Sequence, residues 1–502
     1  MHTQTYTAAV YGLSCTKITV ELHIAQGWPG VTIVGLPDTT IRESKERVRT
    51  AWKNISIPFP YEKRITINLA PANVKKIGSG FDLPIFFALL LSYYKKTYKK
   101  TLLIGELTLD GRVQGVNGVL PVVDFAKKNG FTQVIVPDQN KQEASLVEGI
   151  DIYPIKHVND LITFIENQEE LTPYTYKDVI KKQKTIYSCD FSDIKGHAFA
   201  KRALEIAATG GHNILLHGPP GSGKTLLAKS LISILPPLNK KEAVEVTKIY
   251  SVSRSESTMH SLQQKRPFRS PHHTASSTSI IGGGSTPLPG EVSLSHRGVL
   301  FLDEFPEFER VVTESLRQPL EDHTVTITRA QGSATYPASF IFVASMNPCP
   351  CGYANDEKIT CTCSPVEVLR YTKKISGPIL DRIDLHIEVP RIPIDELEKD
   401  AVIETSSYVQ QRVLEARDVQ KTRLNGIKLN SEMNNKELKQ FCVLTKEAKR
   451  LLKQAAETYV LSTRSYYKII KVARTIADLS ADEMIDTAHV AEALQYRMHY
   501  RT

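Results

Sequence analysis

The sequence predicts an α/β protein of three successive units, with a nucleotide-binding core in the middle. Three patterns favour this fold class. A glycine-rich loop separates a strand-like run from a helical run at 213–235, strand and helix patterns alternate before residue 168, and helical periodicity dominates after residue 393. A chain of 502 residues with 41% hydrophobic and 23% charged residues is typical of an ordinary globular protein.

The first unit, assigned to residues 1–168, alternates apolar strand patterns with helical ones. Expected strands are 16–24, 65–70 and 132–137, and expected helices are 40–54 and 81–94. A polar, lysine-rich stretch at 169–188 lacks an apolar period and is interpreted as a linker. The core is assigned to 189–392, and 393–502 forms a helical unit with apolar residues three and four positions apart.

Composition constrains the setting of the protein. The net charge of +9 permits a polyanionic partner without requiring one. No uninterrupted apolar run approaches ~18 residues, so no membrane partner is expected, and the N-terminus lacks the basic and apolar regions of a secretory signal. Seven cysteines, an odd number, do not form a disulfide scaffold in so long a chain, so a cytoplasmic location is expected.

The strongest functional signal is the segment GPPGSGKT, which fits the phosphate-binding pattern G-x-x-x-x-G-K-[ST] in full. Its glycines let successive backbone N–H groups point at phosphate oxygens, and the following helix adds its partial positive charge. Lys224 should reach the β- and γ-phosphates of ATP, and Thr225 should hold Mg²⁺ through its hydroxyl. The predicted cofactor-binding residues are Gly218, Pro219, Pro220, Gly221, Ser222, Gly223, Lys224 and Thr225.

Two further strand ends supply the polar groups that ATP hydrolysis needs. The apolar run within 298–305 leads to Asp303, which should bind Mg²⁺ through water, and to Glu304, which should polarise the attacking water. The run 339–347 ends on Asn347, whose amide can orient the same water. The three strand ends together predict an ATPase site.

Two arginines lie at positions where they could assist phosphoryl transfer. Arg382 follows a predicted helix and precedes a strand, and Arg464 opens a helix of the C-terminal unit. A positioned arginine can raise the rate of phosphoryl transfer by about 10³–10⁵. The alternative for each is an ordinary surface or salt-bridging arginine.

These residues carry a family resemblance. The segments 266–304 and 316–330, with GLPDTTIRESKERVRTA near the N-terminus, are similar to the YifB/ComM family of magnesium-chelatase-like AAA+ ATPases, and the resemblance covers nearly the whole chain. It implies an AAA+ core, a C-terminal helical lid and an N-terminal α+β domain of the Lon-protease type. Relatives of this kind act as ring motors on DNA and drive branch migration during natural transformation. The resemblance therefore implies single-stranded or branched DNA as the partner.

The resemblance also assigns roles to individual residues. Asn347 matches sensor 1, and Arg382 matches the arginine finger supplied to the neighbouring subunit's nucleotide. Arg464 matches the sensor-2 arginine of the lid and is expected to touch nucleotide in its own subunit. An arginine that acts on a neighbour implies self-assembly into a ring, expected to be a homohexamer.

Two insertions of such motors, here 266–297 and 322–338, are expected to project into the central pore. They carry Arg266, Arg269 and Arg329, which could follow a phosphate backbone without reading sequence. They also carry His272 and His273, for which structural packing is the alternative. On one strand these adjacent histidines would point to opposite faces, which disfavours a metal pair.

The Lon-like N-terminal unit raises the possibility of a protease with a Ser-Lys dyad, and Ser79 is the tempting nucleophile. Alignment with the Lon helix instead places Phe81 at the nucleophile's position and a residue near Val119 where Lon has its lysine. The unit is therefore expected to lack the dyad and to serve as a scaffold or a nucleic-acid platform.

Four of the seven cysteines form two Cys-x-Cys pairs directly after the sensor strand: Cys349, Cys351, Cys361 and Cys363. Brought together at the base of a loop, they would give a tetrahedral sulfur shell suited to a structural Zn²⁺. Free thiols and regulatory disulfides are the alternatives.

The function expected from the sequence is thus an ATP-driven AAA+ ring motor on DNA, a helicase-like translocase of recombination or DNA uptake. One alternative is a chelatase-type motor that drives metal insertion into a porphyrin; the Lon-like unit disfavours it. Another is an adaptor that uses nucleotide only to control assembly. The intact Glu304 and Arg382 disfavour the adaptor.

Overall fold

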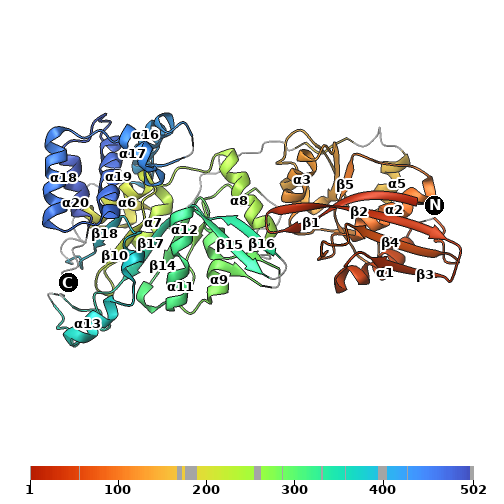
Figure 1. Ribbon diagram of the computed structural model, residues 1–502, viewed down its shortest axis with the longest axis horizontal. Helices are drawn as coiled ribbons and strands as arrows, with labels where there is room; N and C mark the ends of the chain where they lie inside the picture. Colours follow the sequence, from red (N-terminus) through yellow and green to blue (C-terminus); the bar gives the residue numbers. More distant parts are fainter. Residues whose placement is uncertain are drawn as a thin grey trace.

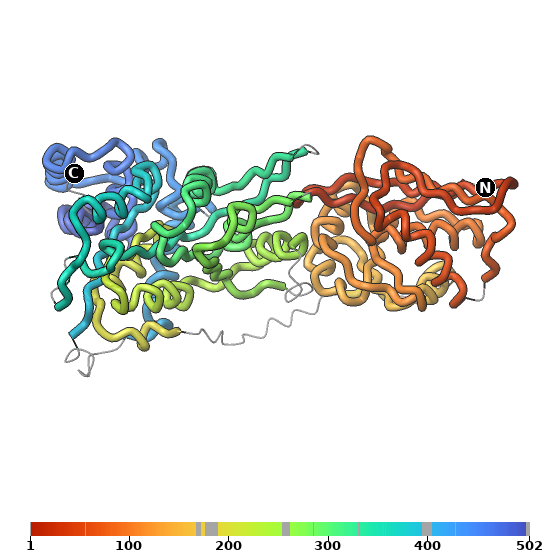
Figure 2. Tube along the Cα trace, turned by 90° about the horizontal axis from the view of Figure 1, so that it is seen from below, coloured from red at the N-terminus to blue at the C-terminus, as the bar shows by residue number. Residues whose placement is uncertain are grey.

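The computed structural model shows a mixed α/β protein with the N-terminal unit at one end and the P-loop core with the C-terminal helices at the other (Figures 1 and 2). The described residues are 2–55, 57–166, 172–175, 189–253, 262–284, 286–329, 332–354, 356, 358–393, 404–426 and 428–497. The predicted fold class is confirmed, because a strand-rich unit, a parallel-sheet core and a helical region follow one another along the chain.

The N-terminal unit is built on a seven-stranded mixed sheet in the order β3-β4-β2-β1-β5-β8-β9. The strands are β1 (His2–Tyr11), β2 (Ser14–Ala25), β3 (Gly30–Val34), β4 (Arg64–Ala70), β5 (Thr101–Leu103), β8 (Gln133–Pro137) and β9 (Asp151–Ile155). The helices are α1 (Thr39–Trp52), α2 (Asp82–Tyr94), α3 (Val119–Lys128), α4 (Lys141–Ala144) and α5 (Val158–Glu166). Two short antiparallel strands, β6 (Glu106–Leu107) and β7 (Val113–Gln114), pair separately from this sheet. The strands and helices predicted for this unit are confirmed. Because α2 is apolar on every side, it is buried along nearly its whole length.

The core is a five-stranded sheet in the order β11-β14-β17-β10-β18, in which every neighbouring pair is parallel. Its strands are β10 (Ile214–His217), β11 (Phe268–Arg269), β14 (Val299–Leu302), β17 (Ile341–Met346) and β18 (Leu385–Glu388). The middle strands β14 and β17 are buried throughout, as expected for a parallel sheet covered on both faces.

Because the strands are parallel, all their carboxyl ends lie at one edge of the sheet and all their amino ends at the opposite edge. Residues that follow a strand lie at the carboxyl edge, and residues that precede one lie at the amino edge. The register of β10 and β18 shows that these two strands begin and end together: Ile214 pairs with Leu385 at the amino end, and His217 pairs with Glu388 at the carboxyl end. The P-loop therefore lies at the carboxyl edge, whereas the segment before β18 lies at the amino edge.

Helices from two parts of the chain cover one face of this sheet. They are α6 (Ala198–Gly210) and α7 (Lys224–Ile234) of the core, and α16 (Ser406–Arg423), α17 (Asn435–Phe441), α18 (Lys446–Thr458), α19 (Thr463–Leu479) and α20 (Thr487–Gln495) of the C-terminal unit. Their apolar residues share one cluster with the strands, for example Leu204, Val413 and Ile476. The helical unit is thus packed on the core.

The other face carries the shorter elements of the core. These are α8 (Lys240–Val252), α9 (Ser277–Ile281), β12 (Gly282–Gly283), β13 (Leu288–Pro289), α10 (Glu291–Leu294), α11 (Arg310–Ser315), α12 (Arg317–Asp322), the hairpin β15 (Thr324–Arg329) and β16 (Gly332–Pro337), α13 (Pro365–Thr372) and α14 (Gly377–Leu380). Tyr11 and Leu13, around the β1–β2 turn, pack against the apolar cluster that contains Tyr336 of β16. The N–H of Gly118 also donates to the carbonyl oxygen of Ser251 at 2.7 Å. The N-terminal unit therefore contacts the core directly.

Most of the predicted linker 169–188 lies outside the described residues. Within 172–175, the N–H of Tyr174 donates to the carbonyl oxygen of Ile152 at 2.8 Å, so this part stays against β9. Across the described ranges, every helix is too short or too polar to cross a bilayer.

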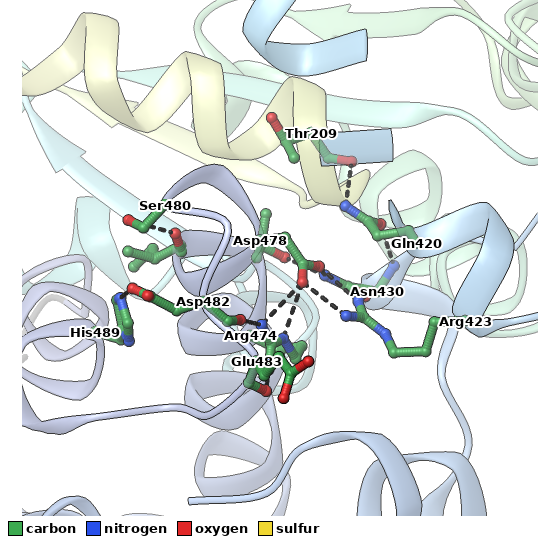
Figure 3. A network of polar contacts seen from close by, with 12 residues as sticks. Thr209, Gln420, Arg423, Asn430, Arg474, Asp478, Ser480, Asp482, Glu483 and His489 are labelled. Atoms are coloured by element: carbon green, nitrogen blue, oxygen red, sulfur yellow. Dashed lines mark hydrogen bonds and ion pairs between the residues drawn. The ribbon is translucent and has the colours of Figure 1, made fainter. Parts of the chain in front are cut away.

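A buried polar network ties the C-terminal helices to one another and to α6 (Figure 3). The carboxylate of Asp478 accepts hydrogen bonds from Arg474 at 3.0 Å, from Arg423 at 2.7 Å and from Asn430 at 2.8 Å. Gln420 extends the network to the carbonyl oxygen of Thr209 in α6 at 3.2 Å. The carboxylate of Asp478 thus provides the negative counter-charge for the guanidinium groups of both Arg474 and Arg423.

Replacing Asp478 with Ala should lower the free energy of unfolding of the helical unit by about 3–5 kcal/mol, because the buried Arg474 and the partly buried Arg423 lose their counter-charge. Thermal unfolding followed by circular dichroism measures the effect as a lower Tm. Glu457→Ala is the matched control, since the Lys453–Glu457 pair is exposed and spans 3.9 Å. Equal Tm values for the two variants would contradict the role given to Asp478.

Candidate nucleotide-binding site

The P-loop has the geometry that the sequence predicts, between β10 and α7. A side chain at Gly218 is excluded, because a Cβ there would lie 2.1 Å from the carbonyl oxygen of Val389. Gly221 and Gly223 have φ values of 75° and 88°, in the region that favours glycine. The loop is therefore held tightly against the end of β18 and leads into the N-terminus of α7, where anions bind favourably.

The side chain of Lys224 folds back over this loop. Its ammonium donates to the carbonyl oxygens of Gly218 at 2.7 Å and Pro219 at 2.8 Å, and to Oδ1 of Asn347 at 3.1 Å. Burial lowers the pKa of Lys224 to about 8, although the nearby carboxylates of Asp303 and Glu304 oppose the shift. The lysine of the P-loop is thus in direct contact with Asn347, the residue after β17.

The predicted magnesium residues also meet. The hydroxyl of Thr225 donates to Oδ2 of Asp303 at 2.9 Å, and the hydroxyl of Ser345 donates to Oδ1. Hydroxyl and carboxylate oxygens are the ligands that Mg²⁺ prefers, so the donor set fits this ion. Ser345 was not predicted; it lies near the end of β17, two residues before Asn347.

Glu304 stands beside this group with its side chain 55% exposed. Its backbone is in the left-handed region, with φ 52° and ψ 47°, which is uncommon for a residue with a side chain and often marks a functional site. Nδ1 of His273 lies 3.7 Å from the Glu304 carboxylate. His272 and His273 are not in a strand as assumed, and their rings lie 4.1 Å apart, so the expected opposite orientation is wrong.

The two predicted arginines come together at the amino edge of the sheet. Both Arg382 and Arg464 bind the carboxylate of Glu321, at the end of α12. Asn213, directly before β10, donates to the carbonyl oxygen of Arg382 at 3.1 Å. This arrangement places Arg464 at the edge opposite its own P-loop, which disfavours the expected contact with nucleotide in its own subunit.

A cavity of about 640 Å³ adjoins this pair of arginines. Lys468 and Lys471 of α19 also line it, and Lys468 forms an ion pair with Asp384 at 2.5 Å. Four cationic side chains therefore gather at the amino edge. Glu321, which binds both arginines, was missed because nothing in its local sequence indicates this contact.

The position expected for two of the predicted DNA-binding residues is wrong. Arg269 belongs to β11, the edge strand of the core sheet, and pairs with Glu291 at 2.5 Å. Arg266 is 8% exposed, and its guanidinium donates to the carbonyl oxygen of Arg297 at 2.6 Å. Both are therefore part of the core instead of a projecting loop. Arg329 is exposed at the end of β15, as expected, and its contact with DNA stays a prediction.

The four clustered cysteines converge. Their sulfur atoms all lie within 4.8 Å of one another, with Cys349 at 3.2 Å from Cys351 and 3.7 Å from Cys361. A tetrahedral zinc site with Zn–S bonds of about 2.3 Å has S–S edges of about 3.8 Å, close to this spacing. The N–H of Ala354 lies 3.2 Å from the sulfur of Cys349.

In the N-terminal unit, both Ser79, the serine considered for the dyad, and Lys76, three residues before it, have other hydrogen-bond partners. The hydroxyl of Ser79 donates to the carboxylate of Glu106, and the buried ammonium of Lys76 donates to the carbonyl oxygen of Gly35 at 2.7 Å. Phe81 is the N-cap residue of α2 and Val119 begins α3; both are buried. These contacts agree with a unit that lacks the dyad.

Three sequence families match successive parts of the chain. "Magnesium chelatase, subunit ChlI" matches residues 190–397, "Subunit ChlI of Mg-chelatase" matches 20–140, and "Magnesium chelatase, subunit ChlI C-terminal" matches 403–497.

Individual relatives match over nearly the full length. The competence protein ComM of Haemophilus influenzae is 42% identical over 99% of this chain and 97% of its own. The YifB protein of Escherichia coli is 43% identical over 98% of this chain and 96% of its own. A Lon protease of Mycolicibacterium smegmatis is 27% identical over 31% of this chain and 21% of its own, in the N-terminal region.

The shifted pKa of Lys224 predicts a pH dependence of nucleotide binding. Phosphate needs the ammonium form, so affinity should be highest below pH 8 and fall as the free protein loses this proton. Between pH 7.5 and pH 9 the Kd for ADP should rise roughly eightfold. Isothermal titration calorimetry at both pH values tests this, and an unchanged Kd would contradict the titration of Lys224.

Proposed function

The chain belongs to the magnesium-chelatase-like YifB/ComM family of AAA+ ATPases, and we propose that it is an ATP-driven ring motor acting on DNA. The ring is inferred from one observation: the P-loop lies at the carboxyl ends of the core strands, whereas Arg382 and Arg464 lie at their amino ends. One protomer has both halves of a hydrolysis site, but on opposite edges. Each site is complete only where two subunits meet.

The carboxyl edge supplies binding and hydrolysis within one subunit. Residues 218–225 bind the phosphates, and Thr225 and Asp303 would hold Mg²⁺, which neutralises charge on the β- and γ-phosphates when bound. Glu304 polarises the attacking water, and Asn347 orients it. The ammonium of Lys224 leaves its carbonyl partners for the phosphates.

The amino edge supplies positive charge to the neighbouring subunit. Arg382 and Arg464 share the carboxylate of Glu321 in the free protomer, so both can approach the same external phosphate. We assign both arginines to the nucleotide of the adjacent subunit in a homohexamer.

Mixing variants tests this assignment. Arg382→Ala, Arg464→Ala and Lys224→Ala should each lower kcat by about 10³ or more. Mixing Lys224→Ala with either arginine variant should restore activity, because roughly a quarter of the interfaces in a randomly mixed ring are intact. The measurement is the steady-state ATPase rate after subunit exchange.

A mixture of Arg382→Ala with Arg464→Ala discriminates further. If both arginines act on the neighbour, every interface lacks one of them and the mixture stays inactive. Recovery in this mixture, or failure of Lys224→Ala to rescue Arg464→Ala, would contradict the assignment of Arg464.

DNA as the substrate is supported by the full-length relative that is a competence protein and by the basic net charge of +9. The exposed face of the β15–β16 hairpin, with Arg329 at the end of its first strand, is the surface assigned to the phosphate backbone. The proposed activity is branch migration or helicase-like translocation in recombination or DNA uptake. A cytoplasmic location and the unit boundaries 1–168, 189–392 and 393–502 belong to the same proposal.

The ATPase rate with no addition, single-stranded DNA, branched DNA or protoporphyrin tests this proposal. DNA should raise the rate, and protoporphyrin should leave it unchanged; the reverse would favour the chelatase-type motor. Arg329→Ala should weaken DNA binding and lower the slope of log affinity against log salt by about one. Arg450→Ala, an exposed arginine of α18, is the control and should bind DNA as the unchanged protein does.

The four-cysteine cluster is assigned a structural Zn²⁺. Its four sulfur atoms provide a closed shell, and the short S–S distances leave room for one ion of this size. The purified protein should therefore contain about one zinc per chain, and the double variant Cys361→Ser/Cys363→Ser should lose it. Elemental analysis of reduced, chelator-washed protein measures both, with Cys15→Ser as a control that keeps the metal. A zinc content near zero in the unchanged protein would leave the cysteines as thiols.

A further inference from the structure

A cavity of about 560 Å³ opens beside the P-loop, and Asp303 is not among the residues that line it. Pro220, Gly221, Gly223 and Leu226 form one wall, and Arg391 with Ile392 forms another. With the phosphates bound to the N–H groups of the loop, as proposed, the nucleoside half of ATP would extend into the space beside the loop. The volume is in the range of small-molecule sites.

Arg391 and Lys195 are cationic residues that line this cavity, and residues of the cysteine loop contact Arg391. Its Nε lies 3.2 Å from Oδ2 of Asp356, and its guanidinium lies 5.4 Å from the ring centre of Tyr353. The Asp356 side chain is 3% exposed, and its other oxygen accepts from the N–H of Lys358 at 2.9 Å. The carboxylate is therefore fixed by the loop and cannot follow Arg391 if that side chain moves.

The cysteine loop also touches the P-loop itself. Gly352, between Cys351 and Tyr353, has a φ of 89°, and a Cβ there would lie 2.6 Å from Cγ of Pro220. Only a glycine allows this approach. The segment between the two Cys-x-Cys pairs thus contacts the nucleotide site twice, at Pro220 and at Arg391.

We propose that Arg391 binds the nucleoside half of ATP, and that Tyr353 and Asp356 position it, so that a metal in the cysteine loop and nucleotide in the cavity stabilise one another. The planar guanidinium can stack on a purine or donate to its edge while it keeps the ion pair with Asp356. By linkage, a metal that strengthens nucleotide binding is itself bound more tightly when nucleotide is present. This inference rests on the proposed ATPase function, which supplies the ligand.

ADP binding to the full-length protein tests the nucleotide part. Arg391→Ala and Asp356→Asn should each raise the Kd for ADP about tenfold, since a cation contact is lost or misplaced. Arg391→Lys should raise it less, and Arg370→Ala, exposed on α13, should leave it unchanged. Circular dichroism confirms that the variants fold. Arg391→Ala and Arg391→Lys proteins that are folded and bind ADP normally would overturn the role of Arg391.

Zinc release to a coloured chelator tests the coupling. Saturating ADP should slow release from the unchanged protein several-fold but not from Arg391→Ala, and Asp356→Asn should still contain zinc by elemental analysis. Equal release rates with and without ADP, or protein without zinc, would overturn the coupling while leaving Arg391 as a nucleotide ligand. Unchanged protein that bound no ADP would instead contradict the ATPase proposal itself.

Discussion

The parallel direction of the five core strands is the constraint on which the rest of the site depends. It sends the P-loop, Asp303 and Asn347 to the carboxyl edge, and it leaves the segment before β18 at the amino edge. No rearrangement of side chains can bring Arg382 to the phosphates of its own chain across the sheet. If Arg382 takes part in hydrolysis as proposed, the site would be complete only with a second subunit, which is why a ring is proposed.

Much of the fold and of the carboxyl edge could be predicted because their signals are local in sequence. A glycine-rich loop between a strand and a helix identifies residues 218–225, and an apolar run that ends in acidic residues identifies Asp303. Parallel pairing then brings such strand ends together without further information. Lys224 accordingly contacts Asn347, and Thr225 contacts Asp303, so residues assigned to one site from the sequence lie together.

The remaining features depend on tertiary contacts that no short segment encodes. Arg464 opens a helix as predicted, but only packing of the lid shows that it meets Arg382 at Glu321. Arg266 and Arg269 resemble loop residues in sequence, yet Arg269 pairs with Leu300 in the core sheet, and the guanidinium of Arg266 donates to the carbonyl oxygen of Arg297. Arg391 follows β18 with no motif around it, and only the pairing of β18 with β10 shows that it lies beside the P-loop.

The most direct test of the account is the structure of the Glu304→Gln protein with ATP and Mg²⁺, determined by electron cryomicroscopy. This variant should bind ATP without hydrolysing it, because the water loses its carboxylate. The account predicts a closed ring in which the guanidinium groups of Arg382 and Arg464 both lie about 3 Å from phosphate oxygens bound to the neighbouring subunit. A ring in which either arginine contacts the nucleotide of its own chain would contradict it.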